Sequence, residues 1–305
     1  MNGIKYWIAL SETNGIGPVY LKEIYATLSS MSLSAEDLFE CSLDEIVSEF
    51  AFSQKLSELI VQAKDLVNQS DEDYLAMTDA KISAIPFFAS QYPSHLRDML
   101  DNSFPPILYV LGDTSIMNGK SIAILGDGNV SQRGETITFQ TAKELALNNI
   151  ITVSGMAKGV GLIAHRSAII NGGKTAAVLP CGMLQFKPPE ILVDVMNIDN
   201  TAIISPFYPS TESNKFNAFT RNRVICALSS AVFIVEAPEE GGIFEAAKSA
   251  QKLNVPLYTT KYGEYPEHAK GNILILEQMG GHAIQRKKGS TELEPNIDQL
   301  IAHAK

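Results

Sequence analysis

Two patterns of apolar and polar positions divide the chain. Up to about residue 80, apolar side chains recur every three or four positions, as in residues 21–28 and 56–67, which is typical of amphipathic helices. Between two such helices, residues 14–18 form a glycine-rich turn, and Pro18 is placed to begin the next helix. From residue 121 onward, short and wholly apolar runs alternate with helical patterns. That alternation predicts buried parallel strands connected by helices.

These patterns predict an α/β fold: an extended Rossmann-like, doubly wound, mostly parallel sheet, preceded by a small all-α domain similar to SAM or helix-hairpin-helix domains. The expected strands are residues 105–112, 122–125, 150–153, 175–179, 202–204, 231–235 and 256–259. The expected helices between them are residues 135–147, 161–171, 222–228 and 242–253. We predict a helical domain at 1–80 with a linker near 68–73, a Rossmann-like domain at 81–285 and a tail at 286–305. Residues 273–276 suit either a core strand or a dimer edge.

Charge is distributed unevenly along the chain. The net charge of −10 arises within residues 1–80, where four lysines stand against fourteen Asp or Glu (4 − 14 = −10), and the remainder holds 20 basic and 20 acidic residues. The acidity of the helical domain favours packing or partner docking there over contact with nucleic acid. A strongly basic DNA-coating surface is excluded, whereas an anion site in the neutral part is electrostatically allowed.

The sequence gives no sign of membrane insertion or metal chemistry. It has no signal-peptide pattern and no apolar run of about 18 residues, the length needed to span a bilayer. The three cysteines, Cys41, Cys181 and Cys226, are scattered and lack metal-ligand spacing. We therefore expect a cytoplasmic protein without a metal site or other cofactor, and we interpret Cys181 as structural.

Ligands of doubly wound sheets bind beyond the carboxyl ends of the strands, so the loops that follow the strands are the candidate site. Three of these loops are rich in glycine, which allows close backbone approach, and each precedes a helix whose first amides can bind an anion. The candidate phosphate-binding residues in them are Gly126, Gly128, Ser131, Arg133, Gly155, Lys158, Gly159, Gly241 and Gly242. The third loop also carries Glu236, Glu239 and Glu240, whose carboxylates would repel a phosphate.

Arg221 and Arg223 bracket Asn222 at the start of a predicted helix, directly before an apolar strand. Arginine forks and helix N-terminal amides both bind phosphate, so this placement indicates a polyanion site. The alternative is a cap that only ties a loop to the sheet. Phe216 and Phe219 could stack a base here, although a core position is the favoured interpretation for both.

Taken in order, several segments resemble the DprA/Smf family of DNA-processing proteins. The similarity spans about residues 91 to 284, and the order and spacing of its motifs carry it. The matching motifs are Tyr92-Pro93, Pro105-Pro106-Ile107-Leu108-Tyr109, Ser154-Gly155-Met156-Ala157-Lys158-Gly159 with His165, Gly173-Lys174-Thr175, Arg221-Asn222-Arg223-Val224-Ile225-Cys226-Ala227-Leu228-Ser229, Val235-Glu236-Ala237 and Gly271-Asn272-Ile273-Leu274-Ile275.

The resemblance implies an extended Rossmann domain that forms a homodimer and binds single-stranded DNA without chemical turnover. It also implies that the protein loads a RecA-type recombinase onto that DNA during natural transformation. On this basis the phosphate-binding set extends to Lys174, Arg221, Asn222 and Arg223. His165 is interpreted as a hydrogen-bonding helix residue rather than a catalyst.

The chain departs from the family pattern inside the proposed pocket. Gly128 stands where the family has an arginine, and Gly161 where it has an aspartate. Two alternatives therefore stay open. One is a nucleotide-binding sensor or adaptor. The other is a lysine-decarboxylase-like phosphoribohydrolase, whose arginine and glycine loop are partly echoed by Arg223 and residues 241–245.

Overall fold

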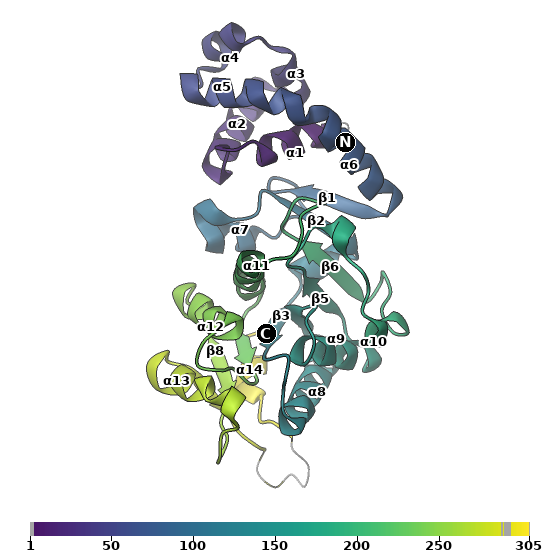
Figure 1. Cartoon of the computed structure of the whole chain (residues 1–305), viewed down its shortest axis with the longest axis vertical. Coiled ribbons are helices and arrows are strands. Elements are labelled where there is room, and N and C mark those ends of the chain that lie inside the picture. The colour runs from purple at the N-terminus through teal and green to yellow at the C-terminus, as the bar shows by residue number, and fades with distance from the viewer. Residues whose placement is uncertain (1–2, 288, 290–293, 305) are drawn as a thin grey trace.

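The chain folds into a helical region at one end of a nine-stranded sheet that carries helices on both faces (Figure 1). The computed structural model describes residues 3–287, 289 and 294–304. The helical start and the mostly parallel α/β sheet confirm the fold class predicted from the sequence. Within the described residues, every helix is too short or too polar to cross a membrane.

Six α-helices precede the sheet, and local sequence sets several of their ends. They are α1 (Ile4–Glu12), α2 (Pro18–Met31), α3 (Ala35–Glu40), α4 (Leu43–Phe50), α5 (Gln54–Ala63) and α6 (Val67–Asp79). Gly15 takes a left-handed φ of 101° after α1, and Pro18 is the first residue of α2, as the glycine-proline pattern predicts. Ser34 and Ser42 begin α3 and α4 with capping boxes, each formed with the acidic residue three positions later.

The linker predicted near residues 68–73 is wrong. These residues lie inside α6, which follows α5 through one 3-10 turn at Lys64–Leu66. Ser70 and Met77 of α6 are buried. The polarity of this segment therefore reflects a helix that buries only a narrow side, and not a loop.

The sheet has the strand order β1-β2-β6-β5-β4-β3-β7-β8-β9. Its strands are β1 (Ile82–Pro86), β2 (Ile107–Gly112), β3 (Ser121–Leu125), β4 (Ile151–Gly155), β5 (Thr175–Val178), β6 (Thr201–Ser205), β7 (Val232–Ile234), β8 (Leu257–Thr260) and β9 (His282–Ile284). The β1–β2 and β2–β6 pairs are antiparallel, and the other neighbours are parallel. The chain runs from β3 through β6 on one side and then crosses to β7 on the other. Doubly wound folds bind ligands at such a reversal of strand order.

Helices cover both faces of the sheet (Figure 1). They are α7 (Ser94–Leu100), α8 (Gln132–Leu147), α9 (Val160–Ile170), α10 (Glu190–Val193), α11 (Lys215–Leu228), α12 (Gly242–Lys252), α13 (Gly271–Gln278) and α14 (Asp298–Ala302). Residues of β3 alternate between two cores: Ile122 and Ile124 cluster with α8 and α9, whereas Ala123 and Leu125 cluster with α11 and α12. The second core continues into the helical region, so those helices and the sheet share one apolar cluster.

Several elements differ from the prediction. Residues 273–276, considered as a strand, lie in α13, and the strand β9 was not predicted. Helix α11 begins at Lys215 and not near residue 222, because Asn214 caps it by accepting a hydrogen bond from the Asn217 N–H at 2.9 Å. The polar start of this helix carries little apolar periodicity, so the cap residue was its main signal in the sequence.

Candidate nucleic-acid interface

The carboxyl ends of β3, β4 and β7 bring the three glycine loops to one edge of the sheet. Glycines let the first two loops touch. A Cβ on Gly126 would approach Val160 Cγ2 to 2.5 Å, and one on Gly159 would approach the Asp127 carbonyl oxygen to 2.5 Å. Gly159 also has a φ of 77°, which glycine adopts without strain. The second loop is thereby packed closely against the first.

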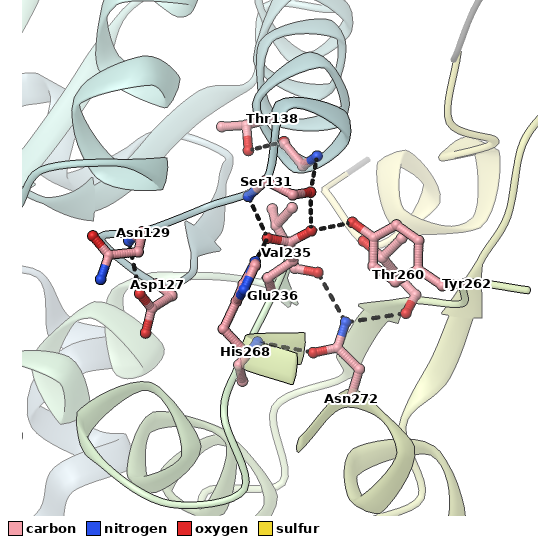
Figure 2. A network of polar contacts seen from close by, with 12 residues as sticks. Asp127, Asn129, Ser131, Thr138, Val235, Glu236, Thr260, Tyr262, His268 and Asn272 are labelled. Carbon is pink, nitrogen blue, oxygen red and sulfur yellow. Dashed lines mark hydrogen bonds and ion pairs between the residues drawn. The ribbon is translucent and has the colours of Figure 1, made fainter. Parts of the chain in front are cut away.

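Glu236, just after β7, extends its side chain from the third loop toward the first loop and toward the segment that follows β8 (Figure 2). Its side chain is fully buried. It accepts hydrogen bonds from the Ser131 N–H at 2.8 Å, the Ser131 hydroxyl at 2.6 Å and the Tyr262 hydroxyl at 2.7 Å, and His268 Nε2 lies 3.0 Å from its Oε2. Burial, and then the hydrogen bond to Glu236, raise the pKa of Tyr262, so its phenol stays a donor at neutral pH.

This network places an anion at the start of α8. Ser131 is the N-cap of α8, and its hydroxyl accepts a hydrogen bond from the Gly134 N–H at 3.0 Å. The start of a helix attracts negative charge, and here a carboxylate of the protein itself supplies it. A phosphate beside Glu236 would be repelled, so the geometry disfavours the predicted cradle at Gly126, Gly128 and Ser131. Glu239 and Glu240, the other two carboxylates of the third loop, are exposed.

Asn272 holds the strand ends beside Glu236 (Figure 2). Its Nδ2 donates to the carbonyls of Val235 at 2.9 Å and Thr260 at 3.1 Å, and its Oδ1 accepts from the Ala237 N–H at 2.9 Å. These three bonds satisfy a buried amide and connect the ends of β7 and β8. The Gly-Asn motif near residue 272 therefore fixes the position from which Glu236 extends.

Arg133 does not replace the arginine that the family has at the position of Gly128. Its guanidinium lies over the Tyr262 ring, 5.0 Å from the centroid, and shares a small cleft with Lys261 and Arg286. Gly128 is exposed, and it precedes Ser131 in the sequence, whereas Arg133 follows Ser131. For Arg133 to act in place of the family arginine, the first loop would have to bring it to the position of Gly128, and the loop is not rearranged in that way.

Arg221 lies inside α11 and not at its start, and its guanidinium contacts the second loop. The residue is 8% exposed, and its Nη1 donates to the Val178 carbonyl at 3.1 Å. A Cβ on Gly155 would meet that Nη1 at 2.0 Å, so glycine is needed there. Burial lowers the pKa of Arg221 to about 10, which leaves it cationic at neutral pH. Within the described residues, its Nε has no hydrogen-bond partner and no carboxylate pairs with it.

Asn222 and Arg223 do not share the environment of Arg221. The Asn222 Nδ2 donates to the Gly242 carbonyl at 3.0 Å and so joins α11 to the start of α12. Arg223 is half-buried, and because residues two apart on a helix do not share a face, its side chain does not lie beside that of Arg221. The alternative interpretation, in which this segment only ties structural elements together, fits Arg221, which bonds to the end of β5, and Asn222, which bonds to the start of α12.

The core positions favoured for Phe216 and Phe219 are wrong. Phe216 is 79% exposed and Phe219 is 40% exposed. Their spacing of three places them on one face of α11, and a Cβ on Gly242 would lie 3.7 Å from the Phe219 ring. Gly241, with a φ of 102°, has open space around its Cβ position. We call Phe216 and Phe219 the aromatic face; it lies beside the start of α12.

Two lysines of the predicted site lie at opposite edges of the sheet. Lys158 is exposed on the second loop. Lys174 directly precedes β5, at the amino edge, and pairs with Asp113 at 2.9 Å. The structure therefore does not bring Lys174 to the glycine loops.

The groups considered for catalysis have contacts of their own. Burial lowers the pKa of His165 to about 4, and its Nδ1 lies 2.6 Å from Thr175 Oγ1. Burial raises the pKa of the Cys181 thiol, which makes it a poor nucleophile. Glu245, in the first turn of α12, pairs with Lys248 at 2.6 Å. Across the described ranges, no group of three or more His, Cys, Asp or Glu residues is arranged to hold a metal ion.

Fold and site together define a Rossmann-like protein whose glycine loops, buried guanidinium and aromatic face meet where the strand order reverses. The family model of DNA recombination-mediator protein A matches residues 83–294. The chain therefore belongs to the DNA recombination-mediator protein A family, which confirms the resemblance to DprA/Smf proteins.

Curated relatives match along most of the chain. The DNA processing protein DprA of Bacillus subtilis is 27% identical over 234 residues, which cover 73% of this chain and 77% of that protein. Protein Smf of Synechocystis is 27% identical over 277 residues, which cover 89% of this chain and 68% of that protein.

Two solved structures share the fold. DprA from Streptococcus pneumoniae superposes with a TM-score of 0.72 at 20% identity, over 92% of this chain and 94% of that one. DprA from Helicobacter pylori gives a TM-score of 0.58 at 28% identity, over 66% of this chain and 90% of that one. The latter structure describes a single-stranded DNA binding mode of the Helicobacter protein.

Proposed function

We propose that this chain is a non-catalytic recombination mediator that binds single-stranded DNA at the carboxyl edge of β3, β4 and β7. The aromatic face is the observation that carries the proposal. Proteins that bind single strands without sequence preference combine aromatic side chains, on which bases stack, with cations along the backbone path. Family membership and the DNA-binding relative from Helicobacter pylori support the same assignment.

The aromatic face accounts for a preference for single strands. Phe216 and Phe219 lie on one face of α11 with exposed rings, so unpaired bases can reach them. Stacking on an aromatic side chain contributes about 1–3 kcal/mol per base, and bases inside a duplex are already stacked on each other. Phenylalanine offers no hydrogen bond that reads a base edge, so this binding is sequence-independent.

Cations and helix amides near the aromatic face would hold the backbone. Lys158 on the second loop and Lys215 at the start of α11 are both exposed. Within the described residues, no side chain caps the start of α12 at Gly241 and Gly242, so the first N–H groups of this helix are open to a phosphate. The charge of Arg221 beneath Gly155 makes the second loop more favourable for an anion without direct contact.

Fluorescence anisotropy of labelled oligo-dT tests the proposal. Phe216→Ala and Phe219→Ala should each weaken binding about tenfold to hundredfold, the equivalent of one lost stacking contact. Leu147→Ala is the matched control, because Leu147 is 60% exposed at the far end of α8. With about two lysine–phosphate contacts, the slope of log K against log salt should be near −1.4. Unchanged affinity in both phenylalanine variants would refute the proposed site.

Recombinase loading is the further step of this function. The bound strand would be handed to a RecA-type recombinase, and a homodimer would hold two such strands side by side. Strand-exchange assays with single-stranded DNA coated by its binding protein measure the first point, and analytical ultracentrifugation measures the second. If wild-type protein binds oligo-dT but never accelerates recombinase assembly, the recombinase part of the proposal is wrong.

A further inference from the structure

A small cleft opens where β8 and β9 end, farther along the sheet than the glycine loops. The two strands are parallel, so both leave the sheet at its carboxyl edge. The Lys261 N–H continues their ladder by donating to the Ile284 carbonyl at 2.9 Å. The cleft has a volume of about 20 Å³, and its polar lining residues include Arg133 from the start of α8, Thr260, Lys261, Arg286 and Glu294. We call it the β8 cleft.

Basic side chains predominate in the β8 cleft. Arg133, Lys261 and Arg286 line it, against the one lining carboxylate, that of Glu294. Among the residues that the structure describes, no carboxylate forms an ion pair with Arg133 or Lys261. These two cations alone outnumber the carboxylate, and like charges in one cleft repel each other. A bound anion would remove that repulsion.

The fold leaves the hydrogen-bond donors of Arg133 unused. Its guanidinium lies over the Tyr262 ring, 5.0 Å from the centroid, and this contact holds the side chain beside the cleft. Within the described part of the chain, Arg133 donates no side-chain hydrogen bond. A guanidinium carries five N–H donors in a planar fork, which matches the oxygens of a phosphate or carboxylate. Arg133 is therefore held in place with its fork available to an oxyanion.

A buried hydroxyl also lines the β8 cleft. Thr260 is 4% exposed, and its Oγ1 makes no hydrogen bond within the described residues. Buried polar groups nearly always have a partner, so an unpartnered one beside a cleft indicates a place for a ligand atom. A single water needs about 10–15 Å³, so the cleft admits one small polar group and excludes a base or a sugar.

We propose that the β8 cleft binds a phosphate group through Arg133, Lys261 and the Thr260 hydroxyl. The arginine fork, the lysine point charge and a hydroxyl donor all bind phosphate oxygens. The buried carboxylate of Glu236 is not among the lining residues, and its hydrogen bonds to Ser131 and Tyr262 satisfy it, so it does not compete for this cleft.

Two sources carry this group: free phosphate, and a phosphodiester of a nucleic-acid strand. For the first source the inference stands alone. For the second it rests on the proposed function, and the cleft is then a further contact of the strand that binds at the aromatic face. The two sources share the same chemistry at Arg133 and Lys261, so the experiment has one arm for each.

Inorganic phosphate is the first probe, because it tests the cleft without DNA. Thermal unfolding of the full chain is followed over a series of phosphate concentrations, with sodium chloride at matched ionic strength as the reference. Phosphate also stabilises folded proteins by exclusion from their surface, an effect that does not saturate and that variants share. We expect a saturable rise in the melting temperature in addition to that effect.

Three variants and a control assign this rise to the β8 cleft. Arg133→Gln and Lys261→Gln should each raise the dissociation constant of phosphate about fivefold, as expected for one ionic contact at a partly exposed site. Glu294→Gln removes the opposing carboxylate and should lower the constant about threefold, a gain that a folding defect cannot produce. Lys55→Gln removes an exposed lysine of α5 and should leave the constant unchanged.

Labelled oligo-dT separates the two sources. If the cleft holds a strand phosphate, Arg133→Gln should weaken oligo-dT binding about fivefold and make the slope of log K against log salt less steep by about 0.7. If it holds free phosphate, Arg133→Gln should leave oligo-dT affinity unchanged and still weaken phosphate binding.

Two outcomes would overturn the proposal. One is the absence of a saturable phosphate effect in the wild-type protein. The other is an equal effect in the wild type, Arg133→Gln and Lys261→Gln, which would place the phosphate elsewhere. A wild-type protein that fails to bind oligo-dT would refute the proposed function, and the phosphate titration would still decide whether the β8 cleft is an anion site.

Discussion

Replacing Glu236 with glutamine tests whether a buried carboxylate holds the first glycine loop. The carboxylate of Glu236 accepts hydrogen bonds on both oxygens, two from Ser131 and one from Tyr262, with His268 Nε2 at 3.0 Å. Glutamine keeps one oxygen but presents an N–H₂ group toward donors on the other side. Whichever way the amide lies, its N–H₂ group faces either the Ser131 N–H or the hydroxyls of Ser131 and Tyr262, so at least one donor loses its bond to a charged acceptor.

The expected cost follows from these contacts. A hydrogen bond to a charged group contributes about 1.5–3 kcal/mol, and a buried donor without a partner costs about 1–3 kcal/mol. We therefore expect Glu236→Gln to lower the free energy of unfolding by about 3 kcal/mol. With a urea dependence of about 3 kcal/mol per molar, the unfolding midpoint should fall by about 1 M. Glu245→Gln, which removes an exposed carboxylate paired with Lys248, is the control and should change stability by about 0.5 kcal/mol or less.

Urea unfolding measures this difference, and hydrogen exchange locates it. The amides near Ser131 and Gly134 should exchange faster in Glu236→Gln, because their acceptors are lost or displaced. Exchange in α12 should stay unchanged, because none of the hydrogen bonds drawn in Figure 2 joins this helix to the carboxylate. A midpoint shift below about 0.3 M, or unchanged exchange near Ser131, would show that Glu236 does not hold the loop.

Three further predictions test other parts of the site. Burial lowers the pKa of His165 to about 4, so this group takes up a proton in the unfolded chain first and should contribute a loss of about 2 kcal/mol in stability from pH 7 to pH 5; His165→Asn should lack that contribution when its urea unfolding is compared with that of the wild type. Gly155→Ala places a methyl group 2.0 Å from a buried guanidinium and should cost about 2–4 kcal/mol by thermal unfolding, whereas Gly17→Ala, with open space, should cost less than about 1 kcal/mol. Lys174→Gln should leave oligo-dT affinity within about twofold, whereas Lys158→Gln should weaken it severalfold and flatten its salt dependence in anisotropy titrations.

The sequence predicted the strands well because their signal is local. Strand β3, for example, is apolar on both faces, as buried parallel strands are. Phe216 and Phe219 show where the same reasoning fails. Their apolar side chains favoured a core position, but both lie in the polar first half of α11, where no buried stripe forms. An apolar residue inside a polar segment was the available sign that they are surface residues.

The role of Glu236 could not be read from neighbouring residues. Its burial depends on Ser131, Tyr262 and His268, which come from segments that only the folded sheet brings together. In sequence, Glu236 precedes two exposed glutamates, so the three seemed alike. Arg221 is a similar case: the arginine-asparagine-arginine order suggested a polyanion site at a helix start, but these residues lie inside α11, where Arg221 and Arg223 do not share a face.

The helices that follow the three glycine loops differ in what their surroundings leave for a ligand. The start of α8 already holds the Glu236 carboxylate through Ser131. The start of α9 is packed against the first loop, where Gly159 touches backbone atoms of that loop. The start of α12 has open space at Gly241 and an exposed phenylalanine beside Gly242. A phosphate chain is therefore best accommodated at α12, displaced from the position that the first glycine loop suggests, and next to the rings on which its bases can stack.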